Sequence, residues 1–141
     1  MDLYSREIVG LSCGTSQGLS LIKTMLDDFK RNMDARGVSL AGSLLHSDMG
    51  WQYQHDGYCK TLEEAGIVQS MSRKGNCIDN AATEQVFGHL KDEFYAGREF
   101  ASYEQFKNEL DAYIIHWNTK RRQIRLEGHT PEEFRNMSLT A

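Results

Sequence analysis

The sequence predicts an α/β fold in which a mixed sheet is flanked by helices. Two short apolar runs, residues 40–45 and 67–69, are typical of strands. An amphipathic pattern over residues 16–36 precedes the first run, and a second helical segment, residues 54–65, separates the two runs. Because the run at 40–45 follows the helix over 16–36, which itself follows the strand-like residues 3–13, we expect a crossover unit around this helix.

The flanking elements follow from local patterns. Residues 3–13 mix Tyr, Ile, Val and Leu and stop at Gly14, which favours one or two short strands. In the helix over 16–36, Leu19, Ile22, Leu26 and Phe29 recur at three- and four-residue spacing, and Gly37 closes it. Further helices are predicted over 54–65 with Gly66 as the stop, over 79–95 with Asp79 or Asn80 as the cap, over 103–120, and from Pro131 onward.

The bulk composition is that of one globular domain over residues 1–141, with 40% hydrophobic and 26% charged residues. No apolar run has the length of a membrane span and no signal peptide is evident, so we expect a cytoplasmic protein without a membrane partner. The three cysteines are far apart, which indicates neither a disulfide framework nor a zinc site. A net charge of −4 argues against indiscriminate binding to nucleic acid.

Two acidic residues are distinguished by their positions. Asp48 follows a predicted strand and precedes a sharp turn at Gly50, and Glu84 lies near the start of the predicted helix over 79–95. Functional groups of α/β sheets gather beyond the carboxyl ends of strands, so both carboxylates are candidates for one cleft. Mg²⁺ prefers carboxylate oxygens and keeps open positions for phosphate oxygens, as phosphoryl transfer requires.

One side of the same helix carries four residues at positions three, four and seven apart: Glu84, Phe87, Gly88 and Lys91. Lys91 would then point the same way as Glu84, toward an anionic ligand. Gly88 removes a side chain there at a cost of about 1 kcal/mol to the helix. Close approach of a DNA backbone and close packing of another helix both explain this glycine.

Three segments together resemble a known family. They are HSDMGWQY at 46–53, SMSRKGNCIDNAATEQVFGHLKDE at 70–93 and YIIHWNTKRRQIRLEGHTPEEF at 113–134. In order and spacing they are similar to the integrase-core (DDE-type) transposases of two-frame bacterial insertion sequences, relatives of retroviral integrases. The resemblance runs from DLYSREIVG at 2–10 to TPEEF at 130–134.

The resemblance implies roles for individual residues. Residues 49–83, 35 in number, separate Asp48 from Glu84, as in the second and third members of the family's Asp, Asp, Glu triad. Asp48 and Glu84 are therefore assigned as catalytic, metal-binding residues, and Lys91 is similar in position to the family's DNA-contacting lysine. The first aspartate of the triad lies upstream of the segment that begins at Asp2, so Asp2 is not assigned to it. We expect an N-terminally truncated core.

The family fold and reaction follow as expectations. The fold would be RNase H-like with its first strand missing, which exposes a sheet edge and favours a homo-oligomer, at least a dimer. The reaction would be cleavage and strand transfer of DNA, both transposon ends and target, with Mg²⁺ or Mn²⁺ as cofactor. Because one carboxylate is missing, little or no activity is expected of the isolated chain. Two alternatives are a non-catalytic remnant that binds DNA or a full-length transposase, and an RNase H-like nuclease.

Other residues carry competing interpretations. His46 could join Asp48 at a metal, but a structural or supporting role is favoured. Arg73 and Lys74 precede Gly75 in a loop and are predicted to follow the DNA backbone, although a solvated turn has the same composition. The basic cluster over residues 120–125 favours a solvated helix end over DNA contact. The aromatic residues Phe94, Phe100, Tyr103, Phe106, Tyr113 and Trp117 are predicted to pack in the core.

Overall fold

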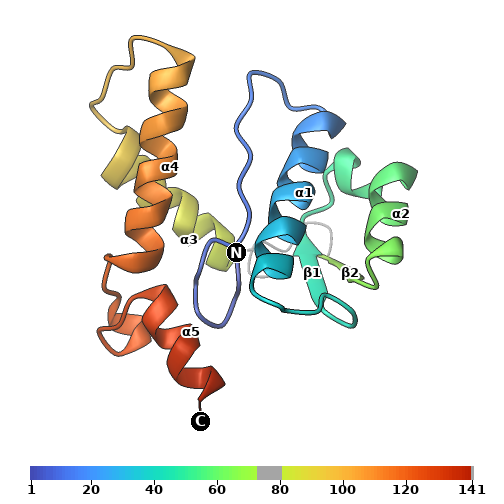
Figure 1. The fold of residues 1–141 in the computed structure, drawn as a ribbon. Coiled ribbons are helices and arrows are strands. Elements are labelled where there is room, and N and C mark those ends of the chain that lie inside the picture. Colours follow the sequence, from blue (N-terminus) through green and yellow to red (C-terminus); the bar gives the residue numbers. More distant parts are fainter. Residues whose placement is uncertain (73–80, 141) are drawn as a thin grey trace. The chain divides into compact units, whose positions relative to one another are not determined.

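The computed structural model describes residues 1–72 and 81–140, which form two compact units. One unit, Gly10–Glu84, contains α1 (Leu19–Ala35), β1 (Leu44–Ser47), the 3₁₀ turn η1 (Trp51–Gln54), α2 (Asp56–Glu64) and β2 (Val68–Met71). The other unit, Met1–Val9 with Gln85–Ala141, contains most of α3 (Ala81–Leu90), the π-helical segment η3 (Lys91–Tyr95), α4 (Tyr103–Thr119), the 3₁₀ turn η4 (Ile124–Leu126) and α5 (Pro131–Leu139) (Figure 1).

The crossover unit predicted around the helix over 16–36 does not form, because residues 3–13 contain no strand; the crossover unit that is present consists of β1, α2 and β2. β1 and β2 pair in parallel, with Leu44 opposite Val68 and Ser47 opposite Met71, and α2 lies in the connection between them (Figure 1). The first strand begins later than residues 40–45 predict, because Gly42 has a positive φ of 80° and a turn joins Ser43 N to Leu40 O at 3.0 Å. At its other end the strand extends through His46 and Ser47.

An apolar core fixes this unit. Leu26 of α1, Tyr58 and Leu62 of α2, and Ile67 before β2 are buried against one another. Leu26 lies on the stripe that the helical spacing of residues 16–36 predicts. Gly66 stops α2 as predicted, since its φ of 68° is a left-handed conformation that strains other residues.

The prediction of strands within residues 3–13 is wrong, because none of these residues is in a strand. Their backbone groups bind helix side chains in place of a neighbouring strand. The side chain of Asn118 in α4 accepts a hydrogen bond from the Ile8 amide and donates one to the Ile8 carbonyl, both at 2.9 Å. Asp28 of α1 accepts a hydrogen bond from the amide of Leu11 at 3.0 Å. A ladder needs a paired strand, and side-chain partners satisfy the same groups without one.

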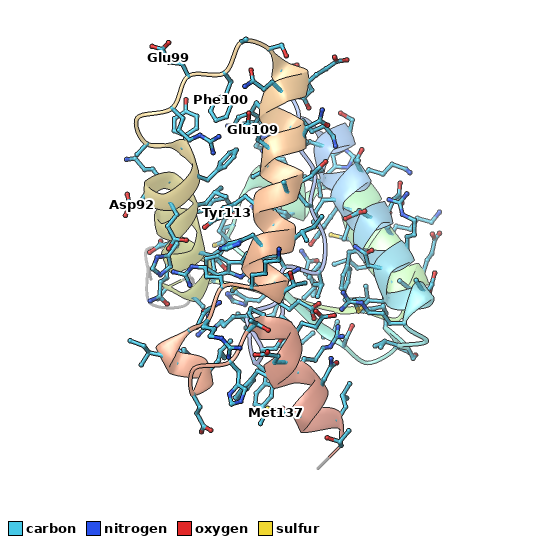
Figure 2. The ribbon with its side chains drawn as sticks, turned by 60° about the vertical axis from the view of Figure 1, so that its left-hand side comes forward. Asp92, Glu99, Phe100, Glu109, Tyr113 and Met137 are labelled. Atoms are coloured by element: carbon cyan, nitrogen blue, oxygen red, sulfur yellow. The ribbon has the colours of Figure 1, made fainter. Side chains whose placement is uncertain are left out.

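Aromatic packing organises the unit that contains α4. Phe94 is 1% exposed, and its ring centroid lies 5.5 Å from Phe100, 5.6 Å from Phe106 and 5.5 Å from Tyr113. Figure 2 shows Phe100 on the loop before α4 and Tyr113 on α4 itself. The core assignment of these aromatic residues is confirmed, whereas Tyr103 is 43% exposed and does not belong to the core.

The predicted helix over 79–95 ends at Tyr95 as expected, although its last turn is π-helical. Its proposed caps, Asp79 and Asn80, lie outside the described residues. At its other end the α-helix changes to π-helical geometry after Leu90, and Ala96 N binds Lys91 O at 2.7 Å. Pro131 begins α5 as predicted, behind a capping box formed by Thr130 and Glu133.

Candidate active site

Asp48 follows the last residue of β1 and is exposed to solvent. Its Oδ1 accepts a hydrogen bond from Gly50 N at 2.8 Å, which turns the chain directly after the strand. The turn continues with Tyr53 N bonded to Gly50 O at 3.0 Å and with Gln54 Nε2 bonded to Met49 O at 2.6 Å. The carboxylate is therefore held by a hydrogen-bonded loop at the carboxyl end of a strand.

Gly50 leaves room for two side-chain oxygens at this turn. A Cβ atom there would lie 3.0 Å from Asp48 Oδ1 and 2.9 Å from Gln52 Oε1. Gln69 of β2 ties the loop back to the sheet, because its Nε2 donates to Tyr53 O at 2.6 Å and its Oε1 accepts from Cys59 Sγ at 3.4 Å. The Cys59 thiol thus supports the residue that anchors the loop.

An open hollow adjoins the carboxylate. Its lining comes from the start of α1 and from the loop after β1: Gln17, Gly18, Ile22, Asp48, Gly50, Gln52 and Tyr53. Burial raises the pKa of the Tyr53 phenol, and the negative charge of Asp48 raises it further. Asp48 thus lies within electrostatic reach of the tyrosine on a surface that a solvated cation can approach.

His46 binds two serines of the neighbouring segment. Its Nδ1 lies 2.9 Å from Ser70 Oγ, and its Nε2 lies 3.2 Å from Ser72 Oγ. Because both ring nitrogens have partners, the geometry favours the structural interpretation of His46 over metal ligation. Neither serine is a site residue predicted from the sequence, although a spacing of two at the end of a strand places both on one face.

Glu84 lies in the first turn of α3, and its neighbours at helical spacing are solvent-accessible with it. Phe87 is 64% exposed, and Gly88 and Lys91 are also exposed. Among the described residues, a Cβ atom at Gly88 would meet nothing within 4 Å. Close packing of another helix therefore does not explain this glycine within the described part of the chain.

The basic cluster over residues 120–125 is only partly a solvated helix end. The side chain of Arg121 is 19% exposed, and its Nε and Nη2 donate to the Glu93 carboxylate at 2.8 and 2.5 Å. Arg122 Nη1 donates to Gly128 O at 2.9 Å. Both arginines make contacts within this unit, but the Arg122 side chain remains 65% exposed, so the solvated interpretation is corrected for Arg121 alone.

The remaining predicted site residues lie where the structure gives no geometry. Arg73 and Lys74 fall outside the described residues, as does the rest of the segment 73–80 between β2 and α3. Within residues 1–72 and 81–140, no group of three or more His, Cys, Asp or Glu side chains is arranged to hold a metal ion. The exposed carboxylates of Asp48 and Glu84 nevertheless offer the oxygen donors that Mg²⁺ and Mn²⁺ accept while keeping bound waters.

The carboxylate at the end of β1 and the crossover unit point to a class of protein, and comparison with known protein families identifies this class. Two family models, both described as "Integrase core domain", match residues 1–77 and residues 84–139. The chain belongs to the integrase core family. The family predicted from the three sequence motifs is thereby confirmed.

Similar proteins agree with this assignment. An uncharacterized transposase-like protein of Haemophilus influenzae is 41% identical over 138 residues, which is 98% of this chain and 62% of that protein. The putative transposase InsK of an Escherichia coli insertion sequence is 38% identical over 138 residues, which is 98% of this chain and 47% of that protein. The chain thus spans about half to three fifths of the length of these relatives.

A solved structure shares the fold. The catalytic core domain of BIV integrase superimposes with a TM-score of 0.66 and 19% sequence identity, covering 96% of this chain and 82% of that chain. This likeness confirms the predicted RNase H-like α/β fold. Among the described residues, no helix combines the length and the apolar character that crossing a membrane requires.

Proposed function

We propose that this chain is the core of an insertion-sequence transposase, which cleaves DNA and transfers the strand with a divalent metal ion. The observation that carries the proposal is Asp48 at the carboxyl end of β1, held by Gly50 N at 2.8 Å, within a chain of the integrase core family. Its separation from Glu84, residues 49–83, supports the assignment of both as metal ligands.

The donor set suits magnesium or manganese. When bound, such an ion activates the attacking water or 3′-hydroxyl and stabilises the leaving oxygen. Asp48 would contribute a carboxylate whose direction is limited by its bond to Gly50, so less entropy is lost when the ion binds. Glu84 would contribute the second carboxylate from the first turn of α3, and the family's first aspartate would contribute the third.

The exposed face of α3 is proposed to contact DNA. Lys91 supplies a positive charge, and Gly88 leaves room for a sugar-phosphate backbone because a Cβ there would meet no described atom within 4 Å. Phe87 supports this proposal, since 64% exposure of a large aromatic side chain is unfavourable in water but suits stacking on a base. Arg73 and Lys74, just before α3, are proposed to follow the same backbone.

We also propose the DNA substrates and the protein partner of the reaction. Transposon ends and target DNA are the substrates, and a second copy of the chain is the expected protein partner. DNA binding without chemistry would correspond to the non-catalytic alternative, and cleavage without joining to the nuclease alternative.

The test is Mn²⁺-dependent nicking and strand joining on plasmid DNA, run beside a gel shift. Asp48→Asn and Glu84→Gln are compared with Asp34→Asn and Glu63→Gln, which remove exposed carboxylates elsewhere. We expect any activity to disappear in the first pair and to persist in the second. Activity that survives Asp48→Asn or Glu84→Gln would contradict the assignment, and failure to bind DNA would contradict the substrate.

A further inference from the structure

We propose that His46 is the positioning residue for Asp48. Its imidazole ring joins the end of β1 to β2 and to the residue directly after β2, one contact through each nitrogen, and so holds the carboxylate where a metal ion can bind. We call His46, Ser70 and Ser72 the histidine bridge. The inference rests on the proposed function, because it assigns a role relative to Asp48 as a metal ligand.

The bridge spans the last pairs of the parallel ladder. His46 lies opposite Ser70 in the register, and Nδ1 reaches the hydroxyl of this partner at 2.9 Å. Nε2 reaches Ser72, two residues further along, at 3.2 Å. One side chain of β1 thus contacts two hydroxyls on one face of the neighbouring segment.

Ser72 extends the ladder beyond its last named pair. The residue is 8% exposed, its amide donates to Ser47 O at 2.9 Å, and its hydroxyl lies 3.4 Å from the same carbonyl. Ser47 immediately precedes Asp48. The bridge therefore acts on the peptide unit from which the Asp48 turn starts.

Such support is needed because the described ladder is short. β1 and β2 are four-residue strands, and the described sheet contains these two alone. Short, two-stranded sheets are marginally stable, so strand ends fray unless side chains connect them. Fraying at Ser47 would release the turn and spread the Asp48 carboxylate over many positions, which weakens metal binding.

Two other roles for His46 fit the geometry less well. As a metal ligand it would have to give up the contact with Ser70 or with Ser72. As a packing residue alone it would not need a partner on each nitrogen, and a phenyl ring of similar shape would replace it. The bridge predicts instead that loss of the nitrogens changes metal binding at Asp48.

The experiment measures Mn²⁺ binding beside Asp48 without requiring catalysis. In the ¹⁵N-labelled chain, paramagnetic broadening of the Gly50 amide is followed as Mn²⁺ is added, because this amide binds the Asp48 carboxylate directly. His46→Phe keeps a ring and removes both nitrogens. His46→Asn and His46→Gln place an amide near the position of one nitrogen each, and Ser70→Ala and Ser72→Ala remove one contact each.

We expect His46→Phe to raise the Mn²⁺ concentration for half-maximal broadening about three- to tenfold, below the roughly 10- to 100-fold that loss of a direct partner of a metal ligand causes. The single-contact variants should fall between wild type and His46→Phe. Ile67→Val, which trims the core just before β2, serves as a destabilised control whose Mn²⁺ response should not change. The serine variants carry the test if His46→Phe does not fold.

The outcomes separate the inference from the proposed function. Equal Mn²⁺ dependence in wild type, His46→Phe and the serine variants would overturn the positioning role and leave the metal assignment of Asp48 intact. If Mn²⁺ does not broaden the Gly50 amide in wild type, the metal assignment of Asp48 is overturned, and the inference with it. The same follows if the broadening persists unchanged in Asp48→Asn.

Discussion

Glu93 shows how one carboxylate organises the region around α4. It accepts from Arg121 Nε at 2.8 Å and from the Tyr113 hydroxyl at 2.9 Å, and the Arg121 guanidinium lies 4.5 Å from the centre of the Trp117 ring. The hydrogen bonds from Arg121, together with that from Tyr113, lower the pKa of Glu93. Arg121, which the sequence predicts to be solvated, thus binds Glu93 through its N–H groups and packs against Trp117 with the face of its guanidinium group.

Replacing Glu93 by Gln should lower the free energy of unfolding by about 1 kcal/mol at neutral pH, a value reduced for partial solvent exposure. Because the folded pKa lies below the unfolded one, the stabilisation is fully present above the ordinary carboxyl pKa of about 4.3. It is lost as the pH falls through the folded pKa. Urea denaturation of wild type and Glu93→Gln should therefore differ at pH 7 and converge in acid.

Glu63→Gln is the matched control, since Glu63 is exposed on α2. This variant should follow wild type across the whole range. A Glu93→Gln difference that is as large in acid as at neutral pH would show that the carboxylate charge is not the stabilising feature.

At the scale of one element, α3 combines exposed residues with a glycine that the described packing does not require. Gly88→Ala should stabilise the chain by about 0.5–1 kcal/mol, because alanine restricts the unfolded backbone and fits open space. The same methyl group should weaken DNA binding and strand transfer if a DNA backbone approaches this face. Thermal unfolding and a gel shift measure the two effects separately.

A companion variant, Thr83→Ala, changes an exposed α3 position away from the glycine and should leave DNA affinity unaltered. Gly88→Ala with raised stability and unchanged DNA affinity would indicate that this face does not approach the nucleic acid. Lowered stability would indicate instead that the helix packs closely there.

The start of α5 is held by its capping box. Thr130 is 2% exposed, its Oγ1 accepts from Glu133 N at 3.2 Å, and Glu133 Oε2 accepts from Thr130 N at 2.9 Å. Thr130→Ala should cost about 1–2 kcal/mol, whereas Thr130→Ser keeps the oxygen and should cost less. Equal losses of unfolding free energy in urea would mean that the methyl group, not the cap, stabilises the helix.

At the scale of the whole molecule, two apolar centres stabilise the two compact units. Leu26, 1% exposed, lies in the unit with the sheet, and Trp117, also 1% exposed, donates to Arg6 O at 3.0 Å in the other. Leu26→Ala should cost about 2–5 kcal/mol through cavity formation. Trp117→Phe should cost about 1–3 kcal/mol by leaving a buried carbonyl unpaired.

Hydrogen exchange of these two variants tests the predicted single domain. If residues 1–141 unfold cooperatively, each variant should lower the protection of slowly exchanging amides in both units, and for a given variant the free-energy change should be equal in the two units. Protection that falls only in the unit carrying the substitution would show that the units unfold separately, and the single-domain prediction would then be wrong.

Much of the fold could be predicted because its causes are local. The periodic apolar residues of 16–36 become α1, Gly66 ends α2, and Pro131 begins α5. The α/β class and the integrase core family are confirmed, the latter from motifs whose order and spacing the sequence displays. The assignments of Asp48, Glu84 and Lys91 remain predictions that the proposed experiments address.

Other features depend on residues far apart in the chain, and these only the tertiary structure decided. Residues 3–13 have strand-like composition, yet Asn118 binds the backbone of Ile8 and no strand forms. The composition of 120–125 could not show that Arg121 binds Glu93. The partners of His46 depend on the register of β1 and β2. Local periodicity and capping determine where elements form, whereas pairing follows from burial and hydrogen-bond competition, which no local pattern contains.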